Sequence, residues 1–394
     1  MIAQRAHKIQ LDPTVKQVRY FQQACGTARF VWNWALAEWD SQYQAGLKPN
    51  APELKKQFNA CKYEKWPWLE NIHRDAHSQP FADLHKAFQA FFGKHSQKPK
   101  FKKRGRCKDS FYVANDKFQL DGTRIRLPVI GWVRMTEALR FEGKRQYARV
   151  SRVADRWFVS ISVEAVLPDP TPGAGEVGVD VGIKTSIVVS DGTAYQSPKP
   201  LRKKLKRLRR LSRRHSKKVK GSRNKRKSAD KLAKLHWRIA NVRRDFISKS
   251  STDILSKNHA VSIEDLLVSG MLRNRKLSKA IADEGFAELR RQLEYKASAF
   301  GAYIHKVDRF FPSSKRCSSC GHTKATLKLS ERVYICANCG LSVDRDLNAA
   351  LNLKSQLPAA SREVKPVDRR HSRSVPEDGM KQELYRVHSC AQER

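Results

Sequence analysis

Four cysteines near the end of the chain, with the spacing C-x2-C-x15-C-x2-C, constrain the fold of this sequence more than any other feature. They are Cys317, Cys320, Cys336 and Cys339. Two C-x2-C turns, each followed by a glycine, supply the four thiolates that a tetrahedral Zn²⁺ ion requires. Because no fifth candidate ligand is nearby, we expect a closed, structural site. The spacing predicts a zinc ribbon over residues 313–341.

The charge balance predicts a polyanionic partner. The chain has 79 Lys and Arg against 38 Asp and Glu, a net charge of +41. Such an excess repels itself unless a polyanion is present, so nucleic acid is the expected partner. We expect no membrane partner, because no segment approaches the roughly 18–20 consecutive apolar residues of a membrane-spanning helix. The remaining cysteines, Cys25, Cys61, Cys107 and Cys390, are scattered, which is typical of a reducing compartment.

The N-terminal half predicts a β module with a helical insert. Alternating residues predict strands near 5–11, 110–114, 123–128, 131–135, 147–153 and 157–165. Helical spacing predicts helices over 14–43, 51–64 and 75–93. We therefore expect a β module over residues 1–12 and 96–168 and a helical module over residues 13–95. Trp32, Trp34, Trp66 and Trp68 could stack on unpaired bases. Their helical spacing favours a place in the core for most of them.

The C-terminal half predicts an α/β domain. The segment PDPTPGAG, at 168–175, is the clearest linker in the chain. Strands and helices alternate after it, and we assign residues 173–312 and 342–358 to one domain, interrupted by the ribbon. Residues 359–394 are polar and without periodicity, which predicts a disordered tail.

Three acidic residues of this domain stand out by their settings. Asp180 lies within an apolar strand, where an unbalanced carboxylate is costly. Glu264 ends another apolar strand, and Asp346 lies in the first turn of the last helix. Singly, each is more often a cap or a solvated residue. In this order, strand, strand and closing helix, they have the layout of an RNase H-like domain, whose clustered carboxylates hold two Mg²⁺ ions for phosphodiester hydrolysis.

A strongly basic stretch covers residues 201–220, where twelve of twenty residues are Lys or Arg. Leucines recur every three or four residues, which predicts a helix with one anchored stripe and cationic outer faces. Contact with an RNA or heteroduplex backbone explains this charge better than a solvated face does. The candidate contacts are Lys203, Lys204, Arg209, Arg210, Arg213 and Arg214.

Four successive segments carry a specific resemblance. GVDVGIK, IEDLLVSGMLRNRKLSKAI, FFPSSKRCSSCG and CANCGLSVDRDLNAALN resemble the motifs of TnpB, the RNA-guided nuclease of small insertion sequences, which is related to compact type V CRISPR effectors. The segments CGTARFVWNWAL and FKKRGRCKDSF resemble that family's recognition and wedge modules. The resemblance covers residues 1–355.

The resemblance implies a multidomain α/β fold. Its parts are a RuvC-type nuclease domain with an inserted zinc ribbon that loads the target strand, and a β-barrel-like wedge module with a helical recognition insert. It also implies that Asp180, Glu264 and Asp346 are the catalytic, magnesium-binding carboxylates. Asp346 is preferred because it directly precedes L-N-A-A, and Asp344 is the alternative. The implied partners are a guide RNA and double-stranded target DNA, bound by one copy of the chain in a prokaryotic cytoplasm, at the nucleoid.

The same resemblance points to residues that read a short motif flanking the target. They are His77, Ser78, Gln79, Ser110 and Phe111. A glutamine can pair with adenine through two hydrogen bonds. Pro80 follows Gln79 where the family resemblance implies a continuous helix, so the sequence departs from that pattern here.

Two other functions are compatible with the composition. A protein-only transposase of RNase H-like fold would join strands without a guide. A nuclease-silent, RNA-guided repressor would bind without cutting, although all three carboxylates are present. An RNA that purifies with the protein would separate guidance from the transposase hypothesis.

Overall fold

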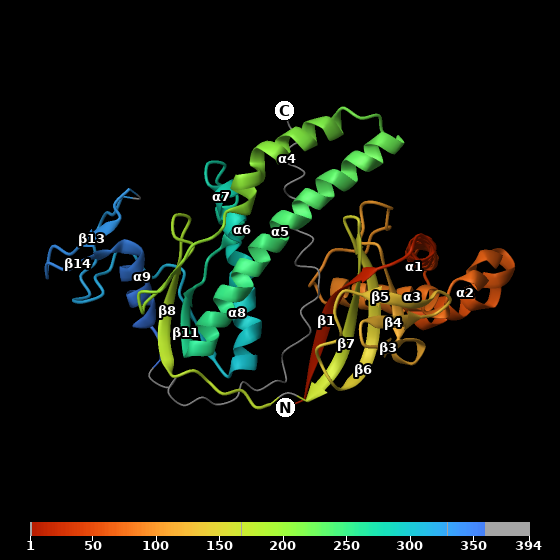
Figure 1. The fold of residues 1–394 in the computed structure, drawn as a ribbon, viewed down its shortest axis with the longest axis horizontal. Helices are drawn as coiled ribbons and strands as arrows, with labels where there is room; N and C mark the ends of the chain where they lie inside the picture. The colour runs from red at the N-terminus through yellow and green to blue at the C-terminus, as the bar shows by residue number, and fades with distance from the viewer. Residues whose placement is uncertain (1, 167, 329, 359–394) are drawn as a thin grey trace. The chain divides into compact units, whose positions relative to one another are not determined.

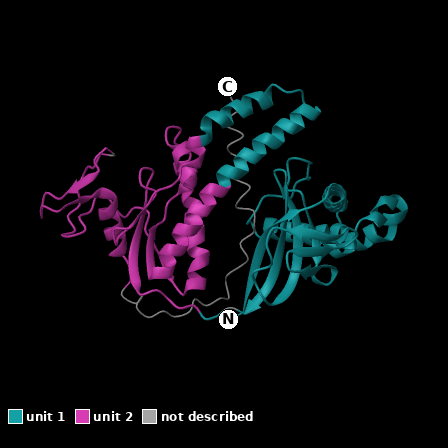
Figure 2. Cartoon of the chain, in the orientation of Figure 1, with its two compact units in different colours: residues 1–169, 204–240 teal, residues 170–203, 241–394 magenta. Residues whose placement is uncertain are grey.

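The chain divides into two units (Figure 2). The computed structural model describes residues 2–166, 168–328 and 330–358. One unit holds the chain up to Asp169 together with residues 204–240, and the other holds residues 170–203 and those from Asn241 onward. The boundary therefore falls within two helices, α4 (Pro200–Ser216) and α5 (Arg223–Lys257). The domain predicted over residues 173–312 has residues in both units.

A seven-stranded antiparallel sheet, in the order β2-β6-β7-β1-β5-β4-β3, forms the base of the first unit. Its strands are β1 (Ile2–Asp12), β2 (Ser110–Ala114), β3 (Gln119–Asp121), β4 (Arg124–Leu127), β5 (Gly131–Met135), β6 (Lys144–Val153) and β7 (Arg156–Val166). The strand β1 pairs with β7 from Ile2–Val166 to Leu11–Trp157 and also with β5. The first residues of the chain thus complete a sheet built from residues 110–166. The predicted strands of this region are confirmed, and β3 is additional.

Side-chain alternation explains this sheet. Ile9 and Leu11 of β1 and Val159 and Ile161 of β7 all point into one core. Since successive residues of a strand face opposite sides, an alternating apolar pattern buries one face of the sheet.

Three helices follow β1: α1 (Val15–Gln44), α2 (Ala51–Lys65) and α3 (Arg74–Phe92). Thr14 and Gln17 form a capping box that starts α1. The three helices share a core rich in aromatic rings, in which Trp32 is buried and Trp34 and Trp66 are half-buried. Trp68, in the short helix η1 (Pro67–Asn71), is exposed and packs edge-on against Phe30.

Helix α3 continues through Pro80, which is buried within it. Proline lacks the N–H that would bond to the carbonyl four residues earlier. The departure noted in the sequence at Pro80 therefore does not interrupt the helix in this structure.

The first unit also includes the start of α5. Lys234 pairs with Asp155 at 2.7 Å, and Trp237 packs against Phe158 with ring centroids 6.4 Å apart. The Arg156 guanidinium lies over the Trp237 ring, 5.1 Å from its centroid. These contacts join α5 to the β6–β7 hairpin and explain why residues 204–240 group with this sheet.

The second unit contains a five-stranded mixed sheet in the order β10-β9-β8-β11-β12. Its strands are β8 (Gly175–Val181), β9 (Ile187–Val189), β10 (Ala194–Tyr195), β11 (Asn258–Glu264) and β12 (Tyr303–Val307). The strands β8, β9 and β10 form antiparallel pairs, whereas β11 runs parallel to both β8 and β12. The strands predicted at EVGVDVGI, TSIVVSDG, 260–263 and 302–307 are confirmed.

Helices cover both faces of this sheet. Val177 and Val179 of β8 pack with residues of α5 and of α8 (Phe286–Phe300). Gly178, between them, points to the opposite face, where α9 (Arg345–Lys354) lies (Figure 1). The sheet is therefore a central layer, and the chain's last described helix covers the face opposite α8.

Short elements complete the second unit. The segment between β11 and α8 contains α6 (Val268–Met271) and α7 (Ser278–Glu284), and Asp283 of α7 accepts hydrogen bonds from the backbone N–H groups of Leu201 and Arg202 at 2.8 and 2.9 Å. Asp283 thereby caps the first turn of α4. The ribbon holds β13 (Val333–Ile335) and β14 (Ser342–Asp344).

Across the described residues no helix is both long enough and apolar enough to pass through a bilayer. The predicted disordered tail, residues 359–394, lies outside the described residues.

Candidate active site

Asp180 is at the centre of the candidate site. Its carboxyl group is half-buried near the end of β8. Burial, together with the negative charges of Glu264 and Asp346, raises the pKa of Asp180 to about 8, and the Arg345 guanidinium opposes this shift. The three carboxyl groups that the sequence singled out therefore lie close enough for their charges to interact.

Strand register brings Asp180 and Glu264 together. Val179 of β8 is paired with Ile263 of β11 in a parallel ladder, so Asp180 and Glu264 are the next residues along two neighbouring strands. Val179 and Ile263 point into the core beneath the sheet, and the residue after each points to the other face. Neighbouring strands are about 4.8 Å apart, so both carboxyl groups project from one face at one end of the sheet.

Close packing of α9 places Asp346 on the same face. A Cβ atom added at Gly178 would lie 2.0 Å from the backbone oxygen of Ala350, so only glycine permits this approach. Asp346 precedes Ala350 by one helical turn and therefore shares its side of α9. Its Oδ2 atom lies 4.0 Å from the position of a Cβ at Gly182, just beyond Asp180.

Asp344 has a different position. It is the N-cap of α9, and its Oδ1 atom accepts hydrogen bonds from the backbone N–H groups of Asp346 and Leu347 at 2.9 and 3.1 Å. Its side chain is exposed, whereas Asp346 is half-buried. The two aspartates thus lie on different sides of the helix start, one capping it and one beside Asp180.

Glu264 and its neighbour Asp265 have different partners. The Ser313 hydroxyl donates a hydrogen bond to Glu264. Asp265 pairs instead with Arg290 and with Arg309, whose Nη2 atom lies 2.8 Å from Oδ2, and the hydrogen bond from Arg290 is the main cause that lowers the pKa of Asp265. Among the described residues no cation forms an ion pair with Glu264.

Two asparagines of α9 attach the root of the ribbon to this site. Asn352 donates to the backbone oxygens of Ser313 at 2.8 Å and of Arg316 at 2.6 Å. Asn348, one turn earlier, donates to the Arg316 oxygen at 2.7 Å and accepts from the Ser318 N–H at 3.0 Å. Both asparagines are buried, so these hydrogen bonds are shielded from water. The chain around Ser313 therefore connects α9 with Glu264 of β11.

The four cysteines form one cluster. Their Sγ atoms all lie within 4.8 Å of one another, and the Cys317–Cys339 and Cys320–Cys336 pairs are each 3.6 Å apart. Sulfurs bound to zinc at about 2.3 Å in a tetrahedron would be about 3.8 Å apart. A hydrogen bond from Asn338 is the main cause that lowers the pKa of Cys320, whereas the pKa of Cys339 is raised, because its neighbours Cys320 and Cys317 outweigh the backbone hydrogen bond from Leu341. The cluster fits a zinc ion.

The two halves of this cluster are built alike. In the first, the N–H of Cys317 bonds to the His322 oxygen at 2.8 Å, and the N–H of Gly321 bonds back to Cys317 at 3.0 Å. In the second, Cys336 and Gly340 make the corresponding bonds at 2.8 and 3.0 Å. Both glycines have a left-handed backbone, with φ of 78° and 73°, which a side chain would disfavour.

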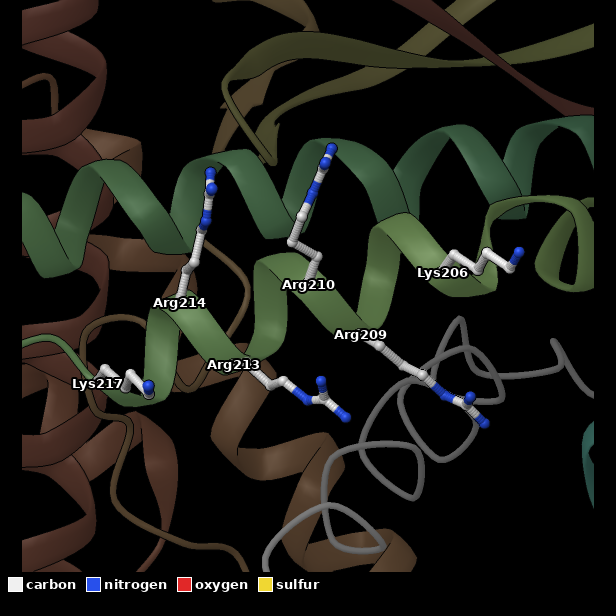
Figure 3. Close-up of a pocket in the computed structure, with 6 residues that line it drawn as sticks. All are labelled: Lys206, Arg209, Arg210, Arg213, Arg214 and Lys217. Carbon is white, nitrogen blue, oxygen red and sulfur yellow. The ribbon is translucent and has the colours of Figure 1, made fainter.

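The predicted backbone contacts lie on α4, and all six side chains are exposed. Arg210 and Arg214 project from one side of the helix and Arg209 and Arg213 from the other (Figure 3). Within the described part of the chain, none of the six predicted residues forms an ion pair. Leu208, on the remaining side, is buried. The structure thus presents a helix with an apolar stripe and unneutralised positive charge on two sides.

The predicted motif-reading residues are only partly accessible. His77 and Phe111 are 1% and 2% exposed, because both side chains point into cores of the first unit. In this structure neither ring is open to a nucleotide base. Ser78, Gln79 and Ser110 are half-buried, and Gln79 donates a hydrogen bond to Asp83 at 3.0 Å. For all five residues, reading of a flanking motif stays a prediction.

Sequence reasoning missed Ser313, Asn348 and Asn352. The signal for the asparagines was present, since they recur four residues apart, on one side of α9, soon after Asp346 in the sequence. No local pattern pointed to Ser313, because its bond to Glu264 depends on the fold between β11 and the ribbon.

Three family profiles match this chain. The OrfB_IS605 profile, described as "Probable transposase", matches residues 158–275. A profile of the Cas12f1-like TNB domain matches residues 286–353, and a helix-turn-helix domain profile matches residues 1–48, a range that includes β1 and α1.

Curated relatives match along most of the chain. A protein of Escherichia coli (strain K12), named an RNA-guided DNA endonuclease, InsQ, is 35% identical over 371 residues, covering 89% of this chain and 91% of the relative. A protein of Streptomyces pristinaespiralis, also named an RNA-guided DNA endonuclease, is 34% identical over 366 residues, covering 91% and 90%.

A solved structure, that of a Cas12f1–sgRNA–target DNA complex, aligns with a TM-score of 0.54 at 18% identity. It covers 86% of this chain and 83% of the Cas12f1 chain, and this likeness concerns the fold alone. The identity and coverage of the curated relatives, together with the matching profiles, establish that this chain belongs to the TnpB family.

Proposed function

We propose that this chain is an RNA-guided, Mg²⁺-dependent DNA endonuclease that cuts target DNA beside a short flanking motif. One observation carries the proposal: the register of β8 and β11 and the packing of α9 against Gly178 bring Asp180, Glu264 and Asp346 to one face at one end of the sheet. Three carboxylates gathered in this way repel each other unless cations balance them. An arrangement with that electrostatic requirement suits a metal-dependent phosphodiesterase.

The topology of the second unit supports a RuvC-type, RNase H-like fold. An antiparallel hairpin β8–β9 with β10 is followed by two parallel strands, β11 and β12, and by a helix that packs across β8. The acidic residues fall at the first strand, at the next strand beside it and at the closing helix. We assign residues 173–312 and 342–358 to the nuclease domain and residues 313–341 to a ribbon that loads the target strand.

The donor set fits Mg²⁺. Carboxylate oxygens are the hard ligands that this ion prefers, and Asp180, Glu264 and Asp346 would hold it. Bound magnesium supplies polarisation of the scissile phosphate and activation of the attacking water. The chain's own residues orient the ligands: Ser313 donates to Glu264, and Asp344 fixes the first turn of α9, which carries Asp346. Arg290 and Arg309 neutralise Asp265, so it does not compete for the metal.

Zinc in the four-cysteine cluster would stabilise the ribbon and take no part in the chemistry. All four ligand positions of a tetrahedral ion are filled by thiolates, so none is open to substrate. The ribbon root also contacts α9 through Asn348 and Asn352. The zinc site therefore supports the position of the carboxylates from outside.

Guidance by RNA is proposed from the relatives' names and from the charge of the chain. A net charge of +41 needs many phosphates to balance it. The exposed cations of α4 suit contacts with an RNA or heteroduplex backbone, which position a duplex without reading its sequence. The first unit would supply the wedge, a β-barrel-like module of residues 1–12 and 96–168, and the recognition module, residues 13–95. One copy of the chain would act in the ribonucleoprotein.

Purification with RNA tests this function. The protein should carry a discrete RNA and, with Mg²⁺, should cut DNA that matches part of that RNA. Asp180→Ala should bind RNA and DNA as the native protein does and should not cut. Site-specific binding that survives removal of the RNA would favour the protein-only transposase. Binding without cutting by the native protein would favour the repressor.

A further inference from the structure

Phe310 is the most exposed large apolar side chain of the described residues, with 86% of its surface open to solvent. It lies in the segment between β12 and the ribbon. Burial of a phenylalanine side chain stabilises a fold, and this largely exposed ring contributes almost none of that stabilisation. A ring displayed beside a site for chemistry is a candidate for contact with a substrate.

The backbone around Phe310 is held in place although its ring is free. The N–H of Phe310 bonds to the Asp308 carboxylate at 2.8 Å, and the N–H of Phe311 bonds to the Asp308 oxygen at 3.1 Å. Ser313 closes a further turn onto Phe311 at 2.8 Å. A ring that projects from such a turn loses little backbone freedom on binding a ligand.

This turn is attached to the candidate active site on both sides of Phe310. Before it, Arg309 bonds to the carboxylate and the backbone oxygen of Asp265, at 2.8 and 3.1 Å. After it, the Ser313 hydroxyl bonds to Glu264. Residues one and three positions away from Phe310 therefore contact the end of β11 where the carboxylates lie.

The place of this ring, beside a site whose chemistry would act on nucleic acid, favours a nucleic-acid strand as its occupant. The cations next to it in the chain, Lys306 and Arg309, are already paired with Glu294 and Asp265, each at 2.8 Å, so the ring itself is the group left to contact a ligand. An aromatic ring presents a face on which any nucleobase can stack, and such stacking does not depend on sequence. A base can reach the ring only when its strand is unpaired, as a strand that enters a nuclease site would be.

We propose that Phe310 stacks on one unpaired base of the DNA strand that the three carboxylates cut, next to the scissile phosphate. The inference rests on the proposed nuclease function and adds to it a substrate-binding residue. Stacking there fixes the strand so that one phosphate lies at the carboxylates, without selecting the base.

Target DNA with single abasic nucleotides across the cut site tests this inference. In the native ribonucleoprotein, one abasic position should lower the rate of cleavage about tenfold, the scale of one lost stack. Phe310→Ala should lower the rate on intact DNA by a similar factor, and the same abasic position should lower it no further. Phe310→Trp keeps a stacking face and should retain cleavage.

Phe92→Ala is the matched control, since Phe92 is 64% exposed and belongs to the first unit. It should respond to the abasic positions as the native protein does. Native-rate cleavage by Phe310→Ala, or losses that multiply with every abasic position, would overturn the inference while the nuclease function stands. If the native protein, like Asp180→Ala, does not cut matched DNA, the proposed function itself fails.

Discussion

The two side-chain clusters of the second unit, the four cysteines and the three carboxyl groups, are assembled in opposite ways. The cysteines come from two turns close in sequence, each closed by local backbone hydrogen bonds and a glycine with a left-handed backbone. The carboxylates come from segments far apart in the chain and meet through a parallel strand register and through one helix that packs against Gly178. The first geometry is local, whereas the second depends on the packing of the whole sheet.

This difference determines how each cluster responds to change. A local cluster is lost when one of its ligands is replaced, whereas substitutions elsewhere in the chain affect it little. A cluster built by tertiary packing can fail at residues that bind nothing, such as Gly178 or the asparagines of α9.

The largest effect is expected at the carboxylates. Asp346→Ala should lower DNA cleavage by roughly 10⁴-fold or more, since removal of one member of a catalytic group usually costs that much. Asp344→Ala should still cut DNA, because the Asp344 carboxylate caps α9. Loss of this cap should lower the free energy of unfolding by about 1 kcal/mol. Cleavage assays and thermal denaturation of the two variants check this contrast. Loss of cleavage in Asp344→Ala alone would reverse the assignment.

Zinc removal should have the next largest effect. Elemental analysis should find about one zinc per chain, and Cys317→Ser should lose it, because a structural site needs all four thiolates. The ribbon should then unfold and release Ser313 from Glu264, so cleavage should fall by about 10- to 100-fold, as for other residues that orient metal ligands.

Cys61→Ser is the control for the zinc variant, since Cys61 lies in α2, outside the cluster. It should keep both zinc and cleavage. If zinc-free protein cuts DNA at the native rate, the carboxylates do not depend on the cysteine cluster for their position.

Gly178→Ala tests the packing of α9. The added methyl group would lie 2.0 Å from the Ala350 oxygen, so α9 must shift and carry Asp346 with it. Overpacking of this kind costs about 1–3 kcal/mol of the free energy of unfolding. Gly26→Ala, in α1, is the matched control, because beyond the adjoining backbone of its own helix no atom lies within 4 Å of the new Cβ. The free energy of unfolding, from denaturant titration, and the cleavage rate should both fall in Gly178→Ala only. Unchanged values would mean that α9 does not position Asp346.

Much of the fold was predictable because it rests on local patterns. Period-two alternation located β1 and the strands from β2 to β7, except β3, which has only three residues. The four cysteines and the three acidic residues were also named from the sequence. The burial of His77 and Phe111 was not, since a resemblance gives positions but not the direction in which a side chain points.

Contacts between distant segments explain the rest of what the sequence did not give. The hydrogen bonds from Ser313 to Glu264 and from Asn352 to the Arg316 oxygen join residues whose spacing has no regular period. The association of residues 204–240 with the first unit depends on Lys234 and Trp237 meeting the β6–β7 hairpin. Such pairings follow from the tertiary fold, and no single stretch of sequence encodes them.

The smallest effect is expected from single charges on α4. Unlike the carboxylates, its arginines are exposed and form no described ion pair, so each should act almost independently. Arg209→Gln should lower the slope of log affinity against log salt by about 0.7–0.9, the change for one lost phosphate contact. Arg209→Lys keeps the charge and should leave the slope unchanged. RNA and DNA titrations over a range of salt concentrations measure both, and replacing Lys203, Lys204, Arg209 and Arg210 together should add their separate effects. An unchanged slope in the fourfold variant would mean that α4 faces solvent and that the guide is held elsewhere.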